Sequence, residues 1–106
     1  MRTAEPAPFL PTLRKLTADT RETLAAELFA VEAVREAMTH TACLGRDRLF
    51  LRPKTPVDLR QTTAAVALVQ HLAALGAATF WHPYTADQDG HAETGHELEI
   101  TWRKAE

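Results

Sequence analysis

The sequence predicts a single α+β domain in which two helices pack on one face of a three-stranded, mainly antiparallel sheet. Three observations lead to this prediction. The chain has 106 residues, which leaves no room for a second domain. Two segments carry apolar residues at helical spacing, and three shorter segments alternate apolar and polar residues. The expected order is helix, strand, helix, strand, strand.

Residues 1–18 are expected to form an arm in front of the domain, which spans residues 19–104. Three prolines interrupt this arm, and proline disfavours a continuous helix. We expect the arm to dock on the domain through Phe9 and Leu10. The arm contains no apolar run of signal-peptide length, so the sequence predicts a cytoplasmic protein.

The first helix is expected from about Thr20 to Gly45. Its apolar side chains fall within one stripe at the helical repeat, while the acidic residues lie outside that stripe. The stripe consists of Leu24, Leu28, Val31, Val34 and Met38. A polar residue at 19 or 20 supplies the N-cap, and glycine is a natural helix stop.

A strand and a second helix are expected next. Residues 48–52 read Arg-Leu-Phe-Leu-Arg and end at Pro53, as a short strand does. Residues 55–58 then combine a capping hydroxyl, a proline at the first helical position and an acid three residues after the cap. This combination predicts a helix that starts there, runs to Leu75 and ends at Gly76.

The final third of the chain predicts a hairpin, because residues 77–82 and 96–103 both alternate. If His82 lies opposite His96, the apolar side chains of both strands share one face. This register leaves Trp81 on the opposite face, exposed to solvent and available as an interface anchor. The alternative is that the N-terminal arm covers Trp81 through Phe9.

The loop between these strands, residues 84–95, is the most distinctive stretch. From Tyr84 to Glu99 there are five acidic residues and no Lys or Arg. Such a surface suits a basic partner, including a nucleic-acid-binding protein whose phosphate groove it would occupy. The alternative is a solvated loop that keeps the sheet soluble. The candidate partner-binding residues are Trp81, Tyr84, Asp87, Asp89, Glu93, Glu97 and Glu99.

Residues 68–76, which read Leu-Val-Gln-His-Leu-Ala-Ala-Leu-Gly, lead into Ala-Thr-Phe at 78–80, and the hairpin closes with Leu-Glu-Ile-Thr at 98–101. Residues 57–103 thereby resemble the recognition-helix end and the wing of a winged-helix domain. The resemblance implies a DNA-binding transcriptional regulator.

Basic side chains between residues 46 and 60 are the alternative nucleic-acid contacts. They are Arg46, Arg48, Arg52, Lys54 and Arg60. The same bases could instead pair with acids of the first helix, of the hairpin or of a second copy. The formal net charge of −2 and the acidic wing favour a protein partner over DNA.

Three histidines, His82, His91 and His96, are weighed as zinc ligands together with a nearby glutamate. Their spacing matches no recognised metal signature, so no cofactor is expected. Cys43 is expected to be a small core residue, because the C-terminal end of a helix opposes thiolate formation at a pair such as Cys43 and His40. The chain contains no serine, which removes a serine nucleophile.

The sequence therefore predicts a non-enzymatic protein-interaction module, an inhibitor or an adaptor, that binds a basic partner through an acidic hairpin. The alternative is a winged-helix-like DNA-binding regulator. A homodimer is left open, and no membrane segment is expected because the most apolar run carries polar residues at its centre.

Overall fold

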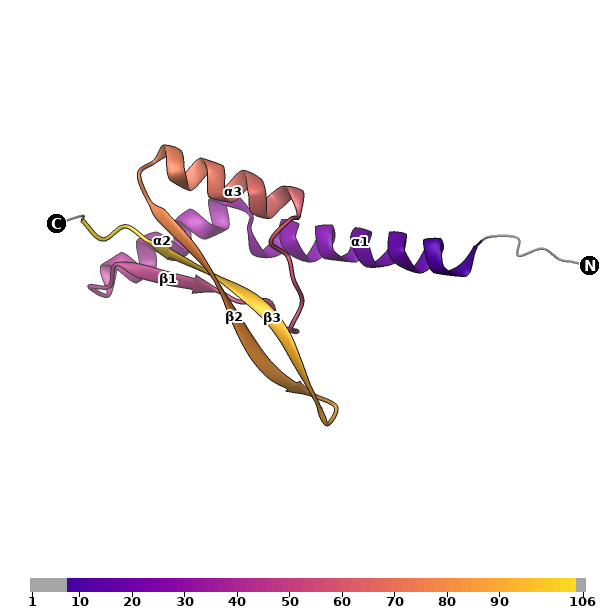
Figure 1. Cartoon of the computed structure of the whole chain (residues 1–106). Coiled ribbons are helices and arrows are strands. Elements are labelled where there is room, and N and C mark those ends of the chain that lie inside the picture. The colour runs from indigo at the N-terminus through magenta and orange to yellow at the C-terminus, as the bar shows by residue number, and fades with distance from the viewer. Residues whose placement is uncertain (1–7, 105–106) are drawn as a thin grey trace, which may run out of the picture.

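The computed structural model describes residues 8–104, and within them the chain forms three helices and three strands (Figure 1). The elements are α1 (Phe9–Leu28), α2 (Val31–Cys43), β1 (Arg48–Leu51), α3 (Thr63–Ala74), β2 (Ala78–Gln88) and β3 (His91–Thr101). The α+β class is confirmed. The predicted number of helices and the predicted order are wrong, since an additional helix precedes the first strand.

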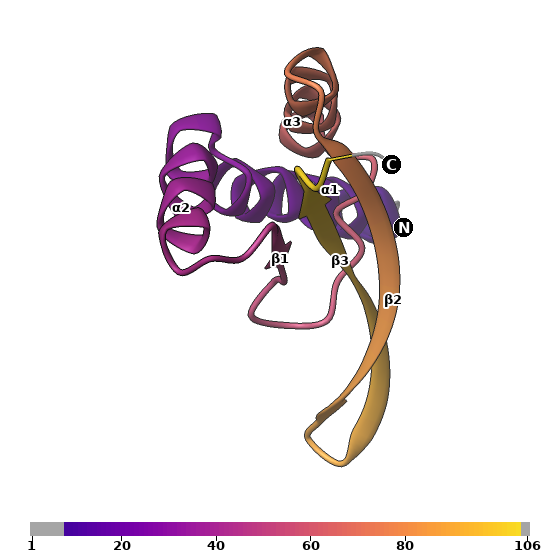
Figure 2. The same ribbon diagram turned by 90° about the vertical axis from the view of Figure 1, so that its left-hand side faces the viewer.

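The sheet has the strand order β1-β3-β2, and both pairings are antiparallel, as the sequence predicts. β1 pairs only with residues 98–101 of β3, whereas β2 pairs with β3 along its whole length. The hairpin is therefore part of a three-stranded sheet at its base and a two-stranded ribbon at its tip. Figure 2 shows the tip extending well beyond the three helices.

The tip is not the long loop that the sequence analysis expects at residues 84–95. The strands continue to Gln88 and resume at His91, so that only Asp89 and Gly90 form the turn. Both turn residues have positive φ, 52° and 82°. An Asp-Gly pair adopts this conformation readily and matches the twist of the flanking strands, which explains the tight hairpin.

The N-terminal half of the chain differs most from the prediction. α1 begins at Phe9, inside the expected arm, while residues 1–7 of that arm lie outside the described part of the chain. Pro11 is tolerated because it lies in the first turn, where the backbone N–H has no partner within the helix. The single helix expected over 20–45 is broken at Phe29, and α2 continues from there at an angle to α1 (Figure 2).

The second predicted helix starts later than expected, because residues 55–58 contact the hairpin instead of opening a helix. Pro56 is buried, and a Cβ atom at Gly95 would lie 2.8 Å from its Cα. The His96 N–H donates to the Val57 carbonyl at 3.3 Å. These tertiary contacts override the local start signal.

α3 takes its cap from Thr62, whose hydroxyl accepts from the Ala65 N–H. The Glu22 carboxylate of α1 also accepts from the Thr63 N–H, at 3.0 and 3.1 Å. The predicted end is confirmed, since Gly76 with φ 91° follows the helix.

The core lies between the sheet and the helices. Its buried members are Ala25, Phe29, Val34, Leu51, Leu59, Ala65, Leu68, Leu72, Leu98 and Ile100. Leu98 and Ile100 alternate with glutamates along β3, so one face of the sheet is apolar and the other is polar.

The predicted register of the hairpin is wrong by one residue. His96 pairs with Pro83, and Leu98 pairs with Trp81. A shift of one residue exchanges the two faces of a strand. Trp81 therefore points toward the core, where its ring packs edge-to-face on Phe29 at a centroid distance of 5.9 Å, and Phe80 is 51% exposed on the other side.

Candidate functional site

The sheet face that points away from the core, called the outer face below, gathers aromatic and charged side chains. Its residues are Arg48, Phe50, Arg52, Phe80, His82, Tyr84, Glu97 and Glu99. Phe50, Glu99 and Phe80 form one row across the three strands. Phe50 is 47% exposed, so an acidic side chain is flanked by two half-exposed phenylalanines.

Ion pairs within the outer face neutralise both of its glutamates. Arg52 Nε donates to Glu97 Oε1 at 3.0 Å, and Arg48 Nη1 lies 3.6 Å from Glu99 Oε2. His82 Nε2 is 2.6 Å from Glu99 Oε1. These two carboxylates are largely covered, at 16% and 12% side-chain exposure. Two of the predicted partner-binding acids are thus engaged inside the molecule.

Tyr84, another predicted contact residue, is also engaged within the chain. The Arg52 guanidinium lies over its ring at 4.2 Å from the centroid, and its hydroxyl donates to the Pro53 carbonyl at 3.4 Å. Burial raises the pKa of the Tyr84 hydroxyl. The ring also covers Gly95, where a Cβ atom would meet it at 2.9 Å. Tyr84 therefore fastens the middle of the hairpin to the segment that follows β1.

The remaining predicted acids, Asp87, Asp89 and Glu93, lie at the hairpin tip and are exposed. None of them forms an ion pair with any residue in the range 8–104. Because the tip extends away from the helices (Figure 2), its negative charge is presented to solvent on a narrow ribbon.

Trp81 does not have the exposed position that the sequence analysis gives it. It is half-buried against the core, and the exposed aromatic side chains near the hairpin are Phe50 and Phe80 instead. The sequence analysis missed both phenylalanines as surface residues. The signal that could have found Phe80 is the Asp-Gly pair at 89–90, because a two-residue turn there pairs Gln88 with His91 and, counting back, Phe80 with Glu99.

The basic residues between 46 and 60 do not form one free patch. Arg48 and Arg52 are held by the glutamates of β3, and Arg60 makes a two-point contact with Asp58 at 2.9 and 2.8 Å. The other two, Arg46 and Lys54, are exposed beyond opposite ends of β1. α3, which precedes the hairpin, contains no Lys or Arg.

The histidines do not converge as the zinc hypothesis requires. His82 and His96 point to opposite faces, because His96 pairs with Pro83, and His91 is exposed beside the turn. Among residues 8–104, no group of three or more His, Cys, Asp or Glu side chains is arranged to hold a metal ion. Cys43 and His40 are both exposed, so the prediction of a core cysteine is wrong.

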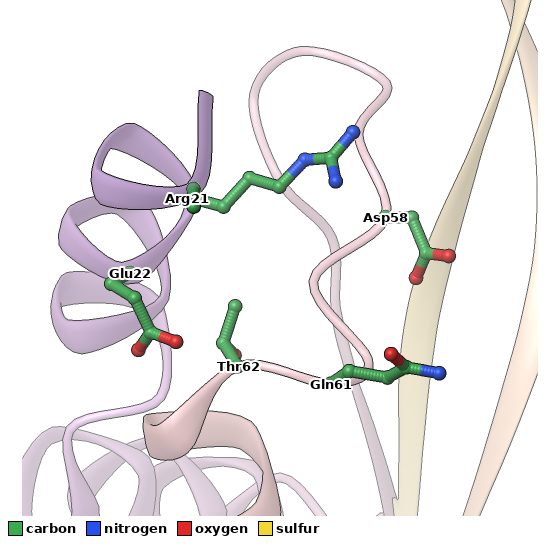
Figure 3. A pocket seen from close by; sticks show the side chains of 6 residues that line it. Arg21, Glu22, Asp58, Gln61 and Thr62 are labelled. Atoms are coloured by element: carbon green, nitrogen blue, oxygen red, sulfur yellow. The ribbon is translucent and has the colours of Figure 1, made fainter. Parts of the chain in front are cut away.

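A small polar depression lies between α1 and the start of α3 (Figure 3). It encloses about 180 Å³ and is lined by Ala18, Arg21, Glu22, Asp58, Gln61 and Thr62. Glu22 caps α3, and Arg60 lowers the pKa of Asp58 to about 2 through a side-chain hydrogen bond. Its two carboxylates are thereby used in holding the fold together.

Comparison of the chain with protein-family models, with curated proteins and with solved structures finds no match. In the part of the chain that the structure describes, no helix has the length and apolar character needed to cross a bilayer.

Proposed function

We propose that the chain is a non-enzymatic protein-interaction module that binds a basic partner through the tip of its β2–β3 hairpin. The observation that carries the proposal is the exposure of Asp87, Asp89 and Glu93 on a projecting ribbon, without an ion pair to residues 8–104. Unpaired charges of one sign accelerate the approach of an oppositely charged partner and select against like-charged ones.

The tip differs from the base of the same hairpin in how its charge is balanced. At the base, Glu97 and Glu99 have basic partners, Arg52 directly after β1 and Arg48 in β1, so their charge is balanced locally. The chain as a whole carries a formal net charge of only −2. The tip is therefore a local concentration of negative charge and not part of a uniformly acidic surface.

The outer face supplies apolar contact area on the same side of the ribbon as Glu93. Along β3, Glu93 lies on the same side as Glu97 and Glu99, which is also the side of Phe80. Phe80 lies six residues before Ala86, the partner of Glu93, and is therefore about 20 Å from the tip acids. Exposed aromatic side chains are common interface anchors, and this span lies within an ordinary protein–protein interface.

Binding without chemistry fits an inhibitor or an adaptor. DNA binding has weaker support, because α3 contains no Lys or Arg and an acidic hairpin tip repels phosphates. Titrations with a basic peptide and with DNA distinguish binding to a basic protein from binding to DNA.

The test uses the double substitution Asp87→Lys and Glu93→Lys. Asp89 stays unchanged because its positive φ favours aspartate in the turn. The matched control is Glu32→Lys with Glu36→Lys, two exposed acids of α2 whose reversal changes the net charge equally. The probe is a fluorescein-labelled oligolysine peptide, followed by anisotropy at about 50 mM salt.

We expect the chain and the control to bind the peptide and the tip variant to lose about tenfold or more in affinity. Equal affinity of the tip variant and the unaltered chain would remove the hairpin tip from the interaction. In a parallel titration, labelled random duplex DNA is expected to stay unbound. Tight DNA binding that weakens steeply between about 50 and 200 mM salt would overturn the proposal in favour of a DNA-binding protein.

A further inference from the structure

β3 has a free edge at the hairpin tip, on the side that faces away from β2. At the base of the hairpin this side pairs with β1, from Leu98 to Thr101. Closer to the tip, the His96 N–H donates to the Val57 carbonyl of the segment that follows β1. Among residues 8–104, no segment pairs with this side of β3 between the turn and Thr94. The tip in Figure 2 is therefore a ribbon of two strands without a third.

The backbone groups along this edge point away from β2. Directly opposite residues of an antiparallel pair alternate between exchanging hydrogen bonds and directing their N–H and C=O groups outward. His96 lies opposite Pro83, which has no N–H, and donates away from β2, so this pair is an outward one. By alternation, Thr94 and Thr85 form the next outward pair. The N–H and C=O groups of Thr94, and of Ala92 two residues further on, are thus directed outward along the edge.

Such an edge is suited to the addition of another strand. Unpaired edge groups are a template for pairing with another chain, and a two-stranded ribbon by itself is marginally stable in water. Ala92 and Thr94 are exposed, so a strand can reach them. The opposite edge, along β2, is interrupted by Pro83, which supplies no donor at an outward position.

β1 shows which kind of strand lies against β3 in this protein. Arg48 Nη1 is 3.6 Å from Glu99 Oε2, and Arg52, directly after β1, donates to Glu97 Oε1 at 3.0 Å. Both arginines are on the outer face, while the leucines between them pack on the core. Glu93 continues the same row of glutamates toward the tip, where it is exposed and has no ion pair within residues 8–104. The row of acids is longer than the strand that balances it.

We propose that an extended basic segment of the partner protein adds to the free edge of β3 as a third strand, antiparallel to β3 and in line with β1. Its alternate Lys or Arg side chains lie on the outer face and pair with Glu93 as Arg52 pairs with Glu97. The residues between them exchange backbone hydrogen bonds with Ala92 and Thr94. Backbone pairing then supplies affinity, and the alternate basic side chains supply specificity. The inference rests on the function proposed for the hairpin tip and adds the conformation and direction of the bound segment.

Backbone methylation of a peptide tests the pairing. The probe is a fluorescein-labelled peptide in which arginine alternates with threonine, titrated with the chain and followed by anisotropy at about 50 mM salt. One derivative carries N-methyl groups on its threonines, and a matched derivative carries the same number on its arginines. In the antiparallel arrangement the threonine N–H groups face β3, whereas the arginine N–H groups face solvent.

We expect the unmethylated and the arginine-methylated peptides to bind equally. The threonine-methylated peptide is expected to lose about tenfold or more in affinity, because it lacks the donors that pair with the edge. Equal binding of all three peptides would overturn the proposal. A loss for the arginine-methylated peptide alone would indicate a parallel strand and would also contradict it.

Proline substitutions test which edge binds the peptide. Thr94→Pro removes an outward N–H from β3, and the control Thr85→Pro removes one from β2 at the residue directly opposite. Both threonines are exposed. We expect Thr94→Pro to weaken binding of the unmethylated peptide about tenfold and Thr85→Pro to leave it unchanged. The reverse result would place the peptide on β2 and contradict the proposal. Circular dichroism and thermal unfolding check that each variant is folded.

Binding of oligolysine separates a failure of strand addition from a failure of the proposed function. If oligolysine binds through the tip acids but methylation of the threonines has no effect, the tip binds basic partners without strand addition, and only the present proposal is overturned. If neither oligolysine nor the alternating peptide binds, the proposed function fails together with strand addition.

Discussion

The base and the tip of the β2–β3 hairpin use the same backbone pairing for different purposes. At the base, one face of β3 packs Leu98 and Ile100 into the core, and the other face holds glutamates that are paired with arginines in β1 and directly after it. At the tip, β1 is absent and the acids have no ion-pair partner among the described residues. An acid on this hairpin is structural where a third strand supplies a base and available to a partner where it does not.

The largest expected difference between the two regions is in packing. Leu98→Ala removes a fully buried side chain at the base, and we expect a loss of about 3 kcal/mol in the free energy of unfolding. Thr85→Ala, at an exposed position near the tip, is expected to change it by less than about 0.5 kcal/mol. Urea unfolding measures both values. Similar losses would mean that the tip is also part of the cooperative core.

A glycine substitution locates the boundary between base and tip. A Cβ atom at Gly95 would lie 2.8 Å from the Pro56 Cα and 2.9 Å from the Tyr84 ring. We therefore expect Gly95→Ala to destabilise the protein by about 2 kcal/mol in thermal or urea unfolding. At Gly90 in the turn there is open space, and Gly90→Ala costs only the strain of a positive φ, about 1 kcal/mol. The reverse order would place the boundary closer to the turn.

A third pair of variants removes one charge from each region. Glu99→Gln loses the contacts with His82 and Arg48, and we expect a loss of about 1 kcal/mol in the free energy of unfolding. Glu93→Gln at the tip has no ion pair to lose within residues 8–104, so its stability is expected to stay unchanged. A comparable loss in both variants would remove the distinction between paired and unpaired acids.

The smallest expected effect is a dependence of stability on pH that comes from Asp58, in the segment between β1 and α3. Arg60 lowers the pKa of Asp58 from 3.8 to about 2, so the ionised carboxylate stabilises the folded state. This contribution is fully present above about pH 4 and is lost as the pH falls toward about 2. The free energy of unfolding of the Asp58→Asn variant should therefore approach that of the unaltered chain as the pH falls from about 4 to about 2. Unfolding at a series of pH values measures this difference. A difference that does not change with pH would assign the loss to packing.

The sequence predicted an element of the fold correctly where that element depends on residues close to it in the chain. The end of α3 at Gly76 and the antiparallel hairpin depend on neighbouring residues, and both predictions hold. The predicted start of α3 was wrong because Pro56 and Val57 contact the hairpin, and a short-range sequence pattern does not reveal such a distant contact. The break at Phe29 was missed for a similar reason, since the chain contains no glycine or proline there and the burial of Phe29 in the core depends on distant contacts.

The charge of the candidate site was predicted correctly, but its register was not, because the Asp-Gly turn at 89–90 was taken as part of a long loop. The five acids of the hairpin are evident from composition, yet only the pairing of Trp81 with Leu98 shows which side chains face solvent. Because the predicted register was shifted by one residue, it placed Phe80 on the core side and Trp81 on the solvent side, the reverse of the observed arrangement. The pairing of Glu97 and Glu99 with arginines also required the strand order, because β1 lies beside β3 and not beside β2.

One comparison tests the central distinction most directly. It measures oligolysine binding and thermal unfolding for two variants that each remove two charges, Asp87→Asn with Glu93→Gln at the tip and Glu97→Gln with Glu99→Gln at the base. We predict that the tip variant loses peptide affinity and keeps its unfolding temperature, while the base variant keeps affinity and unfolds at a lower temperature. Equal loss of affinity in both variants, or destabilisation of the tip variant alone, would contradict the account.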